Sequence, residues 1–206
     1  CDRSEWEISF RELPLRLLKE AKTDYRFDGA VKTLYEKGIH PDAIVGDLEA
    51  TAGLRERYAD RIHHVEDQEI NDLTKSVRFA HTQGYREVLI LGATGLREDH
   101  TLGNISLLMD YAHLFKRVEM LSDYGLFTPI LETTTFASYP GQQISIFVLY
   151  PEGEISTEGL RWPIRRRKLT SWWQGTLNEA LGDQFTVTLS PDCRVIIYRE
   201  ASHTKE

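Results

Sequence analysis

The spacing of apolar residues changes near residue 125, and this change limits the possible folds more than any other feature of the chain. Before residue 125, helical stripes such as Leu73, Val77 and Ala80 alternate with short apolar runs, of which the run at 88–91 is the strongest. Strands that alternate with helices are typical of a mostly parallel sheet covered by helices. We therefore predict an α/β domain with a Rossmann-like sheet over residues 1–126.

The second part of the chain, residues 127–206, has the sequence character of strands. β-branched and aromatic residues are concentrated at 133–139, 143–149, 185–189 and 194–198. Ser190, Pro191 and Asp192 are predicted to form a hairpin turn between the last two of these segments. No long helix is expected, so we predict a domain of antiparallel β-structure. The predicted fold class is α/β plus β.

The composition is that of an ordinary globular protein and excludes several function classes. The chain has 206 residues, of which 41% are hydrophobic and 28% are charged. The net charge of −7 argues against nonspecific binding to nucleic acid or to an anionic membrane. No apolar run approaches the roughly 20 residues that span a bilayer. Cys1 and Cys193 provide no disulfide framework, so a cytoplasmic location is expected.

A glycine-containing turn follows the strand predicted at 88–91. Glycine lets backbone amides approach an anion, and the start of the next helix adds favourable partial charge. A plain strand-to-helix turn needs no charged groups, yet this one contains several. The candidate residues here are Gly92, Thr94, Gly95, Arg97, Asp99, His100 and Asn104. The alternative is that Asp99 only caps the helix and that Arg97 is solvated.

Two carboxylates follow the short apolar strand predicted at 43–45. Asp47 and Glu49 come just after Gly46, at the carboxyl end of this strand, where open α/β sheets bind their ligands. Carboxylates beside a glycine can hold Mg²⁺, which prefers oxygen ligands and bridges to phosphates. The alternative is a turn with a solvated glutamate.

A second acidic segment lies at the start of the helix predicted around 73–80. Asp72 and Lys75 are three positions apart and share a helix face. A carboxylate for a metal and a lysine for a phosphate are commonly paired at triphosphate sites. A purely structural role is the alternative, because Asn71 or Asp72 could cap the helix.

A cluster of aromatic residues lies in the β-rich part of the chain. Trp162 could stack on a flat heterocycle, and Asn178 could form hydrogen bonds with its edge. The alternative is that these residues, with Trp172 and Trp173, fill a β core. The basic run at 165–168 is interpreted as a solvated edge.

In this order, the clusters resemble the motifs of the thiamin pyrophosphokinase family. The matching segments are 28–30, 41–50, 68–75, 95–100, 159–164 and 175–178. The resemblance implies transfer of a pyrophosphoryl group from ATP to the hydroxyl of thiamin, which yields thiamin diphosphate and AMP. It also implies Mg²⁺, an α/β catalytic domain, a β-sandwich thiamin-binding domain over 127–206, and a homodimer with thiamin at the subunit interface.

The resemblance implies a role for each candidate residue. Asp47, Glu49 and Asp72 are expected to hold Mg²⁺, while Lys75 and Arg97 offset charge on the transferred group. Either Asp99 or His100 is expected to orient or deprotonate the hydroxyl. The residues expected to bind the nucleotide are Asp28, Gly29, Gly46, Gln68, Gly92, Thr94, Gly95 and Asn104, and those expected to bind thiamin are Trp162, Thr176 and Asn178.

Three positions depart from the family's motifs and keep two other functions open. Glu49 stands where the family has aspartate, Ala50 where it has serine, and Leu177 where it has serine. One alternative function is pyrophosphoryl transfer to another flat heterocyclic alcohol, such as a hydroxymethyl pterin. The other is a non-catalytic protein that binds thiamin or a nucleotide and has a weakened metal site.

Overall fold

The computed structural model describes two compact units of the chain. The described residues are 25–27 (backbone only), 35, 38, 40–46, 56–65, 67, 69–95, 97–191 and 193–201. One unit is Arg11–Arg86, and the other includes Glu87–Glu206. The boundary predicted at residue 126 falls inside the second unit and stays a prediction.

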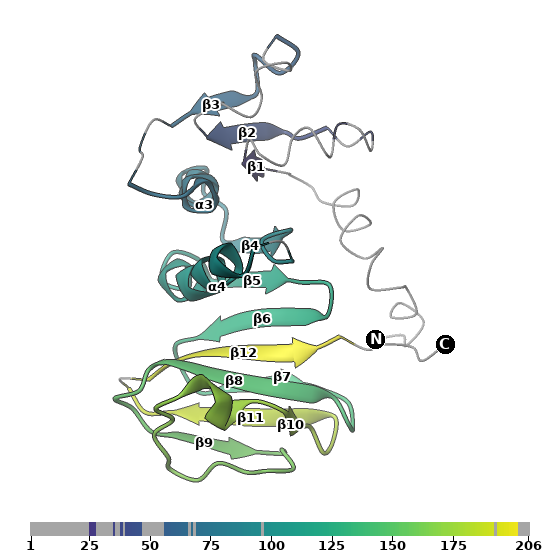
Figure 1. Cartoon of the computed structure of the whole chain (residues 1–206), viewed down its shortest axis with the longest axis vertical. Helices are drawn as coiled ribbons and strands as arrows, with labels where there is room; N and C mark the ends of the chain where they lie inside the picture. Colours follow the sequence, from purple (N-terminus) through teal and green to yellow (C-terminus); the bar gives the residue numbers. More distant parts are fainter. Residues whose placement is uncertain are drawn as a thin grey trace. The chain divides into compact units, whose positions relative to one another are not determined.

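The unit Arg11–Arg86 contains, in its described part, a three-stranded parallel sheet (Figure 1). Its strands are β1 (Tyr25–Phe27), β2 (Ala43–Gly46) and β3 (Ile62–His64), in the order β1-β2-β3. Every residue of the central strand β2 is buried, as expected of a parallel strand covered on both faces. Helix α3 (Asp72–Thr82) lies against β1 and β2. The strands predicted at the sequence level in this region are confirmed.

Helix α3 forms where the sequence provides a cap and an apolar stripe. The Asn71 side chain accepts a hydrogen bond of 2.9 Å from the Thr74 N–H, which satisfies an otherwise unpaired donor of the first turn. Leu73, Val77 and Ala80 are buried and recur at helical spacing. The predicted helix and its predicted cap are therefore confirmed.

The unit that includes Glu87–Glu206 is built on a six-stranded mixed sheet. Its strands are β4 (Glu87–Leu91), β5 (Arg117–Leu121), β6 (Gly125–Ile130), β8 (Gln143–Tyr150), β10 (Asn178–Glu179) and β12 (Arg194–Glu200). Their order is β10-β8-β12-β6-β5-β4. Strands β4 and β5 run parallel, and the other neighbours are antiparallel. Helix α4 (Glu98–Tyr111) connects β4 to β5, as parallel neighbours require.

A second sheet packs on one end of the six-stranded sheet. It contains β7 (Thr134–Ala137), β9 (Ile155–Glu158) and β11 (Gln184–Leu189), in the antiparallel order β7-β11-β9. Ile144, Ile146 and Val148 alternate along β8 and share one core with Phe136 and Phe185 of the second sheet. The predicted antiparallel β-domain is thus confirmed, and it is a β-sandwich.

Helix α4 lies against β5, β6 and β12 (Figure 1). Ile196 is fully buried although its neighbour Ile197 belongs to the sandwich core. Successive residues of a strand point to opposite faces, so α4 covers the face opposite to the second sheet. None of the helices in the described part of the chain is long and apolar enough to cross a lipid bilayer.

The single Rossmann-like sheet predicted for residues 1–126 is not confirmed. The parallel pair β4 and β5 belongs to the same sheet as the antiparallel strands of the sandwich. A tight turn returns the chain from β5 to β6, and the Ser122 N–H donates to the Gly125 carbonyl at 2.9 Å. The open edge of β5 is therefore occupied by the next strand in sequence. The result is a mixed, sheet-rich fold with few helices among the described residues.

The hairpin predicted at residues 190–192 is also wrong. Strand β11 pairs with β7 and β9, whereas β12 pairs with β6 and β8. A turn is present, because the Cys193 N–H donates to the Ser190 carbonyl at 3.1 Å. It carries the chain from one sheet of the sandwich to the other. Both strands bury alternate residues in the shared core, so crossing between sheets satisfies the same pattern as a hairpin.

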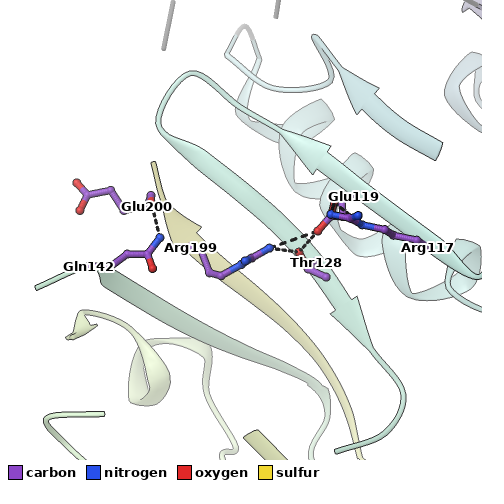
Figure 2. Close-up of polar contacts among 6 residues, drawn as sticks. All are labelled: Arg117, Glu119, Thr128, Gln142, Arg199 and Glu200. Atoms are coloured by element: carbon purple, nitrogen blue, oxygen red, sulfur yellow. Dashed lines mark hydrogen bonds and ion pairs between the residues drawn. The ribbon is translucent and has the colours of Figure 1, made fainter. Parts of the chain in front are cut away.

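A buried carboxylate joins β5 to β6 and β12 (Figure 2). Glu119, with a side chain 8% exposed, accepts hydrogen bonds from Arg117 Nε and Thr128 Oγ1, both at 2.9 Å. Arg199 Nη2 lies 3.3 Å from Oε1, the carboxylate oxygen that also accepts from Thr128. Burial lowers the pKa of Arg199, and Glu119 opposes this shift. The network therefore sets one carboxylate between two guanidinium groups where β5 meets the antiparallel strands of the sheet.

Candidate functional site

Asp72 and Lys75 form an ion pair at the start of α3, in the unit Arg11–Arg86. Lys75 Nζ donates to Asp72 Oδ1 at 3.0 Å. The Lys75 side chain is 3% exposed and that of Asp72 is 38% exposed. The predicted shared face is confirmed. The aspartate holds the lysine in place and still presents part of its carboxylate to solvent.

The remaining candidates of this unit lie outside the described residues, except Gly46. Gly46 ends β2, and its carbonyl accepts a hydrogen bond of 3.0 Å from the Val65 N–H. Asp47 and Glu49 therefore follow a strand end, as predicted, although neither is among the described residues. Within the described part of the chain, no three His, Cys, Asp or Glu side chains are grouped so that they could hold a metal ion. The other candidates outside the described residues are Asp28, Gly29 and Gln68.

The turn between β4 and α4 has the backbone that its glycines predict. Gly92 and Gly95 have φ values of +69° and +96°, in the region that favours glycine. Asn104, in the second turn of α4, donates from Nδ2 to the Ala93 carbonyl at 2.9 Å. Thr94 lies half-buried beside Ala93. Asn104 thus fixes the turn against the helix, which is a structural role for a residue predicted to bind the nucleotide.

Arg97 and Asp99 are paired at the entrance of α4. Arg97 donates from Nε to Asp99 Oδ1 at 3.1 Å and from Nη2 to Asp99 Oδ2 at 2.5 Å. The His100 N–H also donates to Asp99 Oδ1 at 2.9 Å. The Arg97 guanidinium, followed by this backbone hydrogen bond, lowers the pKa of Asp99 below its ordinary value. Arg97 is therefore paired with Asp99 at the helix entrance, while its side chain stays 73% exposed to solvent, as the alternative also expects.

A pocket in the β-sandwich unit brings the predicted acceptor residues together. Its volume is about 260 Å³. It is lined by Trp162, Pro163, Ile164, Arg165, Arg167, Gln174, Gly175, Thr176, Leu177 and Asn178. Trp162 and Thr176 are separated by fourteen positions in sequence, yet both line this one pocket. The structure thus places all three predicted acceptor residues at a single site.

Asn178 holds Trp162 in place through both ends of its amide. Asn178 Nδ2 donates to the Trp162 carbonyl at 2.7 Å, and Asn178 Oδ1 accepts from the Trp162 N–H at 3.1 Å. Asn178 is only 5% exposed. The expectation that Asn178 forms hydrogen bonds with the edge of the ligand differs from the structure, in which the amide bonds the backbone of Trp162. In the described structure Asn178 is therefore a positioning residue.

The tryptophans are surface residues around the pocket. Trp162 and Trp173 are 56% and 74% exposed, so the alternative that they fill the β core is wrong. Trp172 and Trp173 belong to the short helix η2 (Trp172–Gly175), and Trp172 packs on Phe147 of β8 with ring centroids 5.7 Å apart. Thr176 Oγ1 donates to the Trp173 carbonyl at 2.9 Å. The wall of the pocket is therefore anchored on β8 while its aromatic surface stays open.

Backbone strain is concentrated at the pocket. Leu177 and Arg166 have φ values of +58° and +43°, and they are the two non-glycine residues with positive φ in the described part of the chain. Leu177 lines the pocket and Arg166 lies between two residues that do. Such conformations persist where the surrounding structure imposes them, and they cluster at binding sites.

Three residues of the pocket wall lie outside the motif segments and were not expected from the sequence: Arg165, Arg167 and Gln174. Arg165 and Arg167 were assigned to a solvated edge, yet they line the pocket. Their signal was available, because a run of four basic residues at 165–168 is unusual in a chain with a net charge of −7. No comparable signal marks Gln174, whose position depends on how η2 packs on β8.

Comparison with known proteins identifies two family models that match this chain. The model described as thiamin pyrophosphokinase, catalytic domain, matches residues 15–120, and the model for the substrate-binding domain matches residues 125–198. A curated relative, thiamine pyrophosphokinase 1 of Oryza sativa subsp. japonica, is 28% identical over 174 residues. This match covers 76% of the chain and 64% of the relative. The chain thus spans less than two thirds of the length of that relative.

Solved structures with the same fold include three thiamin pyrophosphokinases. The enzyme from Geobacillus thermodenitrificans has a TM-score of 0.74 at 21% identity, with 93% of this chain and 92% of that chain covered. That from Candida albicans has a TM-score of 0.76 at 18% identity, with coverage of 91% and 84%. The yeast enzyme has a TM-score of 0.72 at 18% identity, with coverage of 92% and 82%. At these identities the likeness establishes the fold alone.

Proposed function

The chain belongs to the thiamin pyrophosphokinase family, and from this premise we propose that it transfers the pyrophosphoryl group of ATP to the hydroxyl of thiamin. The products are thiamin diphosphate and AMP. The observation that carries the proposal is the pocket in which Trp162, Thr176 and Asn178 come together. These residues were selected from the sequence as the acceptor site, and their convergence supports that role.

The donor set fits Mg²⁺, the metal that the family implies. The proposed ligands Asp47, Glu49 and Asp72 are all carboxylates, and Mg²⁺ prefers such hard oxygen ligands. Asp72, the member within the described residues, uses Oδ1 for Lys75 and is 38% exposed, so its carboxylate can also face a ligand. When bound, Mg²⁺ would neutralise negative charge on the phosphates of ATP.

Two cationic side chains are proposed to bind the phosphates. Lys75 and Arg97 are each held by a carboxylate, Asp72 and Asp99, in the described structure. A cation that is already oriented loses little side-chain entropy when the phosphate arrives. We assign both residues to stabilising the charge that develops on the transferred group.

His100 is the better candidate for accepting the proton of the thiamin hydroxyl. Arg97 and the His100 N–H lower the pKa of Asp99, which makes the Asp99 carboxylate a weak base at neutral pH. We therefore assign Asp99 to positioning Arg97 and His100 to proton transfer. An Asp99→Asn variant should keep the acidic limb of the pH–rate profile. Loss of that limb would make Asp99 the base instead.

Trp162 is proposed to stack on the cationic ring system of thiamin. Such a contact contributes roughly 0.5–2 kcal/mol beyond burial. The Arg161 guanidinium lies 5.3 Å from the centre of the Trp162 ring, so the ligand would use the other ring face. Asn178 contributes indirectly, because its two hydrogen bonds to Trp162 set where that ring stands.

Three further properties follow from the family and are proposals for this chain. We propose that it acts as a homodimer with thiamin bound between subunits, that ATP is the co-substrate, and that it works in the cytoplasm. Four exposed apolar residues around the pocket support the proposed homodimer, because exposed apolar patches mark interaction sites. They are Trp162, Trp172, Trp173 and Leu177.

The proposed function is tested by incubating the chain with ATP, Mg²⁺ and thiamin and measuring AMP and thiamin diphosphate. Equal amounts of the two products are expected, with no product after chelation of the metal. Asp47→Asn should nearly abolish turnover with the fold intact. Product from hydroxymethyl pterin but none from thiamin would assign another acceptor. Binding of thiamin without any AMP would show that the chain is not an enzyme.

A further inference from the structure

The segment 161–168 is strongly basic within an acidic protein. It contains five cationic residues and no carboxylate, in a chain whose net charge is −7. The cationic residues are Arg161, Arg165, Arg166, Arg167 and Lys168. All five are exposed. A local excess of one charge on an acidic surface is a feature that folding does not require.

The arginines of this segment divide into two kinds. Arg161 pairs with Glu179 at 3.2 Å and Arg166 pairs with Glu154 at 3.3 Å, and neither lines the pocket. Arg165 and Arg167 line the pocket, and neither side chain makes an ion pair or a hydrogen bond with any residue that the structure describes. The two uncompensated guanidinium groups are therefore the two at the pocket.

The rest of the pocket wall carries no charge to balance them. Besides Arg165 and Arg167 it consists of apolar and neutral polar residues. Two unpaired guanidinium groups disfavour the thiazolium cation of thiamin by like-charge repulsion. The same groups favour phosphate oxygens, with which a guanidinium forms two parallel, charge-assisted hydrogen bonds.

We propose that Arg165 and Arg167 form a diphosphate subsite on the acceptor pocket, so that the pocket binds thiamin diphosphate more tightly than thiamin. The inference rests on the proposed function, because that function places the thiamin ring on Trp162. Phosphorylation converts the cationic acceptor into an anion, and the pocket then gains attraction where it had repulsion. The product is retained and competes with thiamin, so the pocket makes the chain sensitive to the level of its own product.

The test measures dissociation constants by calorimetry on the full chain without ATP and Mg²⁺, so that no turnover occurs. At low salt, wild type should bind thiamin diphosphate at least about tenfold more tightly than thiamin. Arg165→Gln and Arg167→Gln should each raise the dissociation constant of thiamin diphosphate about tenfold, equivalent to about 1.4 kcal/mol. Thiamin should bind equally or more tightly to these variants, because a repelling charge is gone.

Arg166→Gln is the matched control. Arg166 lies between the two proposed residues, carries the same charge and is paired with Glu154 outside the pocket. Its replacement should leave the preference for thiamin diphosphate within about twofold of wild type, since an exposed pair contributes little. An equal effect of all three substitutions would reduce the subsite to general surface charge and overturn the proposal.

Two measurements keep the test independent of variant folding. Raising the salt from 0.05 to 0.5 M should weaken the binding of thiamin diphosphate to the wild-type chain, and should leave the binding of thiamin unchanged or slightly tighter because the repulsion is screened. Inorganic pyrophosphate should bind more weakly than thiamin diphosphate, because it lacks the ring that stacks on Trp162. Binding of thiamin diphosphate that does not depend on salt would contradict the subsite. Pyrophosphate that binds as tightly as thiamin diphosphate, and whose binding Trp162→Ala does not change, would contradict a pocket shared by the ring and the diphosphate.

The result also separates this inference from the proposed function. A chain that produces AMP and thiamin diphosphate, but whose Arg165→Gln/Arg167→Gln variant keeps the wild-type preference, has the activity without the subsite. A chain that forms no product, yet loses its preference for thiamin diphosphate in this variant, has the subsite without the activity.

Discussion

At the scale of single residues, the candidate catalytic groups are already organised by charge pairs. Lys75 is held by Asp72, and Arg97 is held by Asp99. Each pair joins residues two or three positions apart, so sequence spacing alone brings them together. The phosphate ligand would meet cations that are oriented before it binds.

The first prediction concerns the titration of Asp99. Its pKa is lowered from 3.8, first by the Arg97 hydrogen bonds. A lowered pKa means that the pair contributes stability above pH 3.8 and that this contribution is lost as the pH falls through the lowered pKa. In Arg97→Gln the pKa of Asp99 should rise towards 3.8, as measured by NMR titration of its carboxyl group.

Arg86→Gln, which removes an exposed cation just before β4, is the control and should leave the Asp99 titration unchanged. An unchanged pKa of Asp99 in Arg97→Gln would show that the backbone of the α4 entrance, and not the guanidinium, dominates.

The second prediction concerns the strained residue at the pocket. Leu177 has a φ of +58° and is 74% exposed, so it buries little and adopts a conformation that L-residues avoid. Leu177→Gly should raise the free energy of unfolding by roughly 0.5–1 kcal/mol, because strain of about 1–2 kcal/mol is relieved and some backbone entropy is lost. Urea denaturation measures the change. A destabilised variant would mean that the Leu177 side chain makes contacts that outweigh its strain.

At the scale of elements, the pocket depends on how closely η2 approaches β8. Gly175 ends η2, and a Cβ atom there would lie 2.3 Å from the Ile146 carbonyl oxygen. Only glycine permits this approach. The wall that carries Thr176 and Leu177 is therefore placed by a contact between two elements and not by local sequence.

The third prediction follows from this contact. Gly175→Ala should push η2 away from β8, lower the free energy of unfolding by about 1–3 kcal/mol and raise the KM for thiamin more than that for ATP. Gly182→Ala is the control, since nothing lies within 4 Å of a Cβ atom at that position. Equal stability and equal KM values in both variants would show that the wall is not fixed by this approach.

At the scale of the whole molecule, the buried carboxylate of Glu119 ties β5 to β6 and β12 (Figure 2). The parallel pair β4 and β5 is thus joined to the antiparallel strands within one sheet. Arg199, with a side chain 18% exposed, depends on Glu119 for its compensating charge.

The fourth prediction tests that dependence. Glu119→Gln should lower the free energy of unfolding by about 1–3 kcal/mol, because a half-buried guanidinium loses its anionic partner. Lys116→Gln is the control, since Lys116 and Glu87 form an exposed pair 3.8 Å apart that contributes little. The change is measured from the midpoint of urea denaturation, provided that the denaturant dependence of the unfolding free energy is the same in each variant. A loss no larger than that of the control would mean that solvent already screens Arg199.

The fifth prediction concerns assembly. If thiamin binds between subunits, a mixture of Trp162→Ala and Asp47→Asn chains contains heterodimers in which one site carries both lesions and the other carries neither. After subunit exchange, activity should rise towards about a quarter of the wild-type level. Each variant incubated alone is the control. Proven exchange without recovery would place a complete site in every subunit.

Sequence by itself determined the features that depend on near neighbours. The cap of α3, the Asp72–Lys75 pair, the glycine turn after β4 and most strand segments follow from patterns a few residues long, and the structure reproduces them. The family motifs are equally local, which is why their order along the chain was enough to indicate the family.

Only the tertiary structure decided which distant segments meet. It placed β4 and β5 in the sheet of the sandwich and sent β11 and β12 to different sheets, because alternating burial is satisfied by either partner. It directed the amide of Asn178 to the backbone of Trp162. It also separated the paired arginines of 161–168 from those that line the pocket. The physical reason is the same throughout: local sequence specifies what a group can bind, and only long-range packing supplies or withholds the partner.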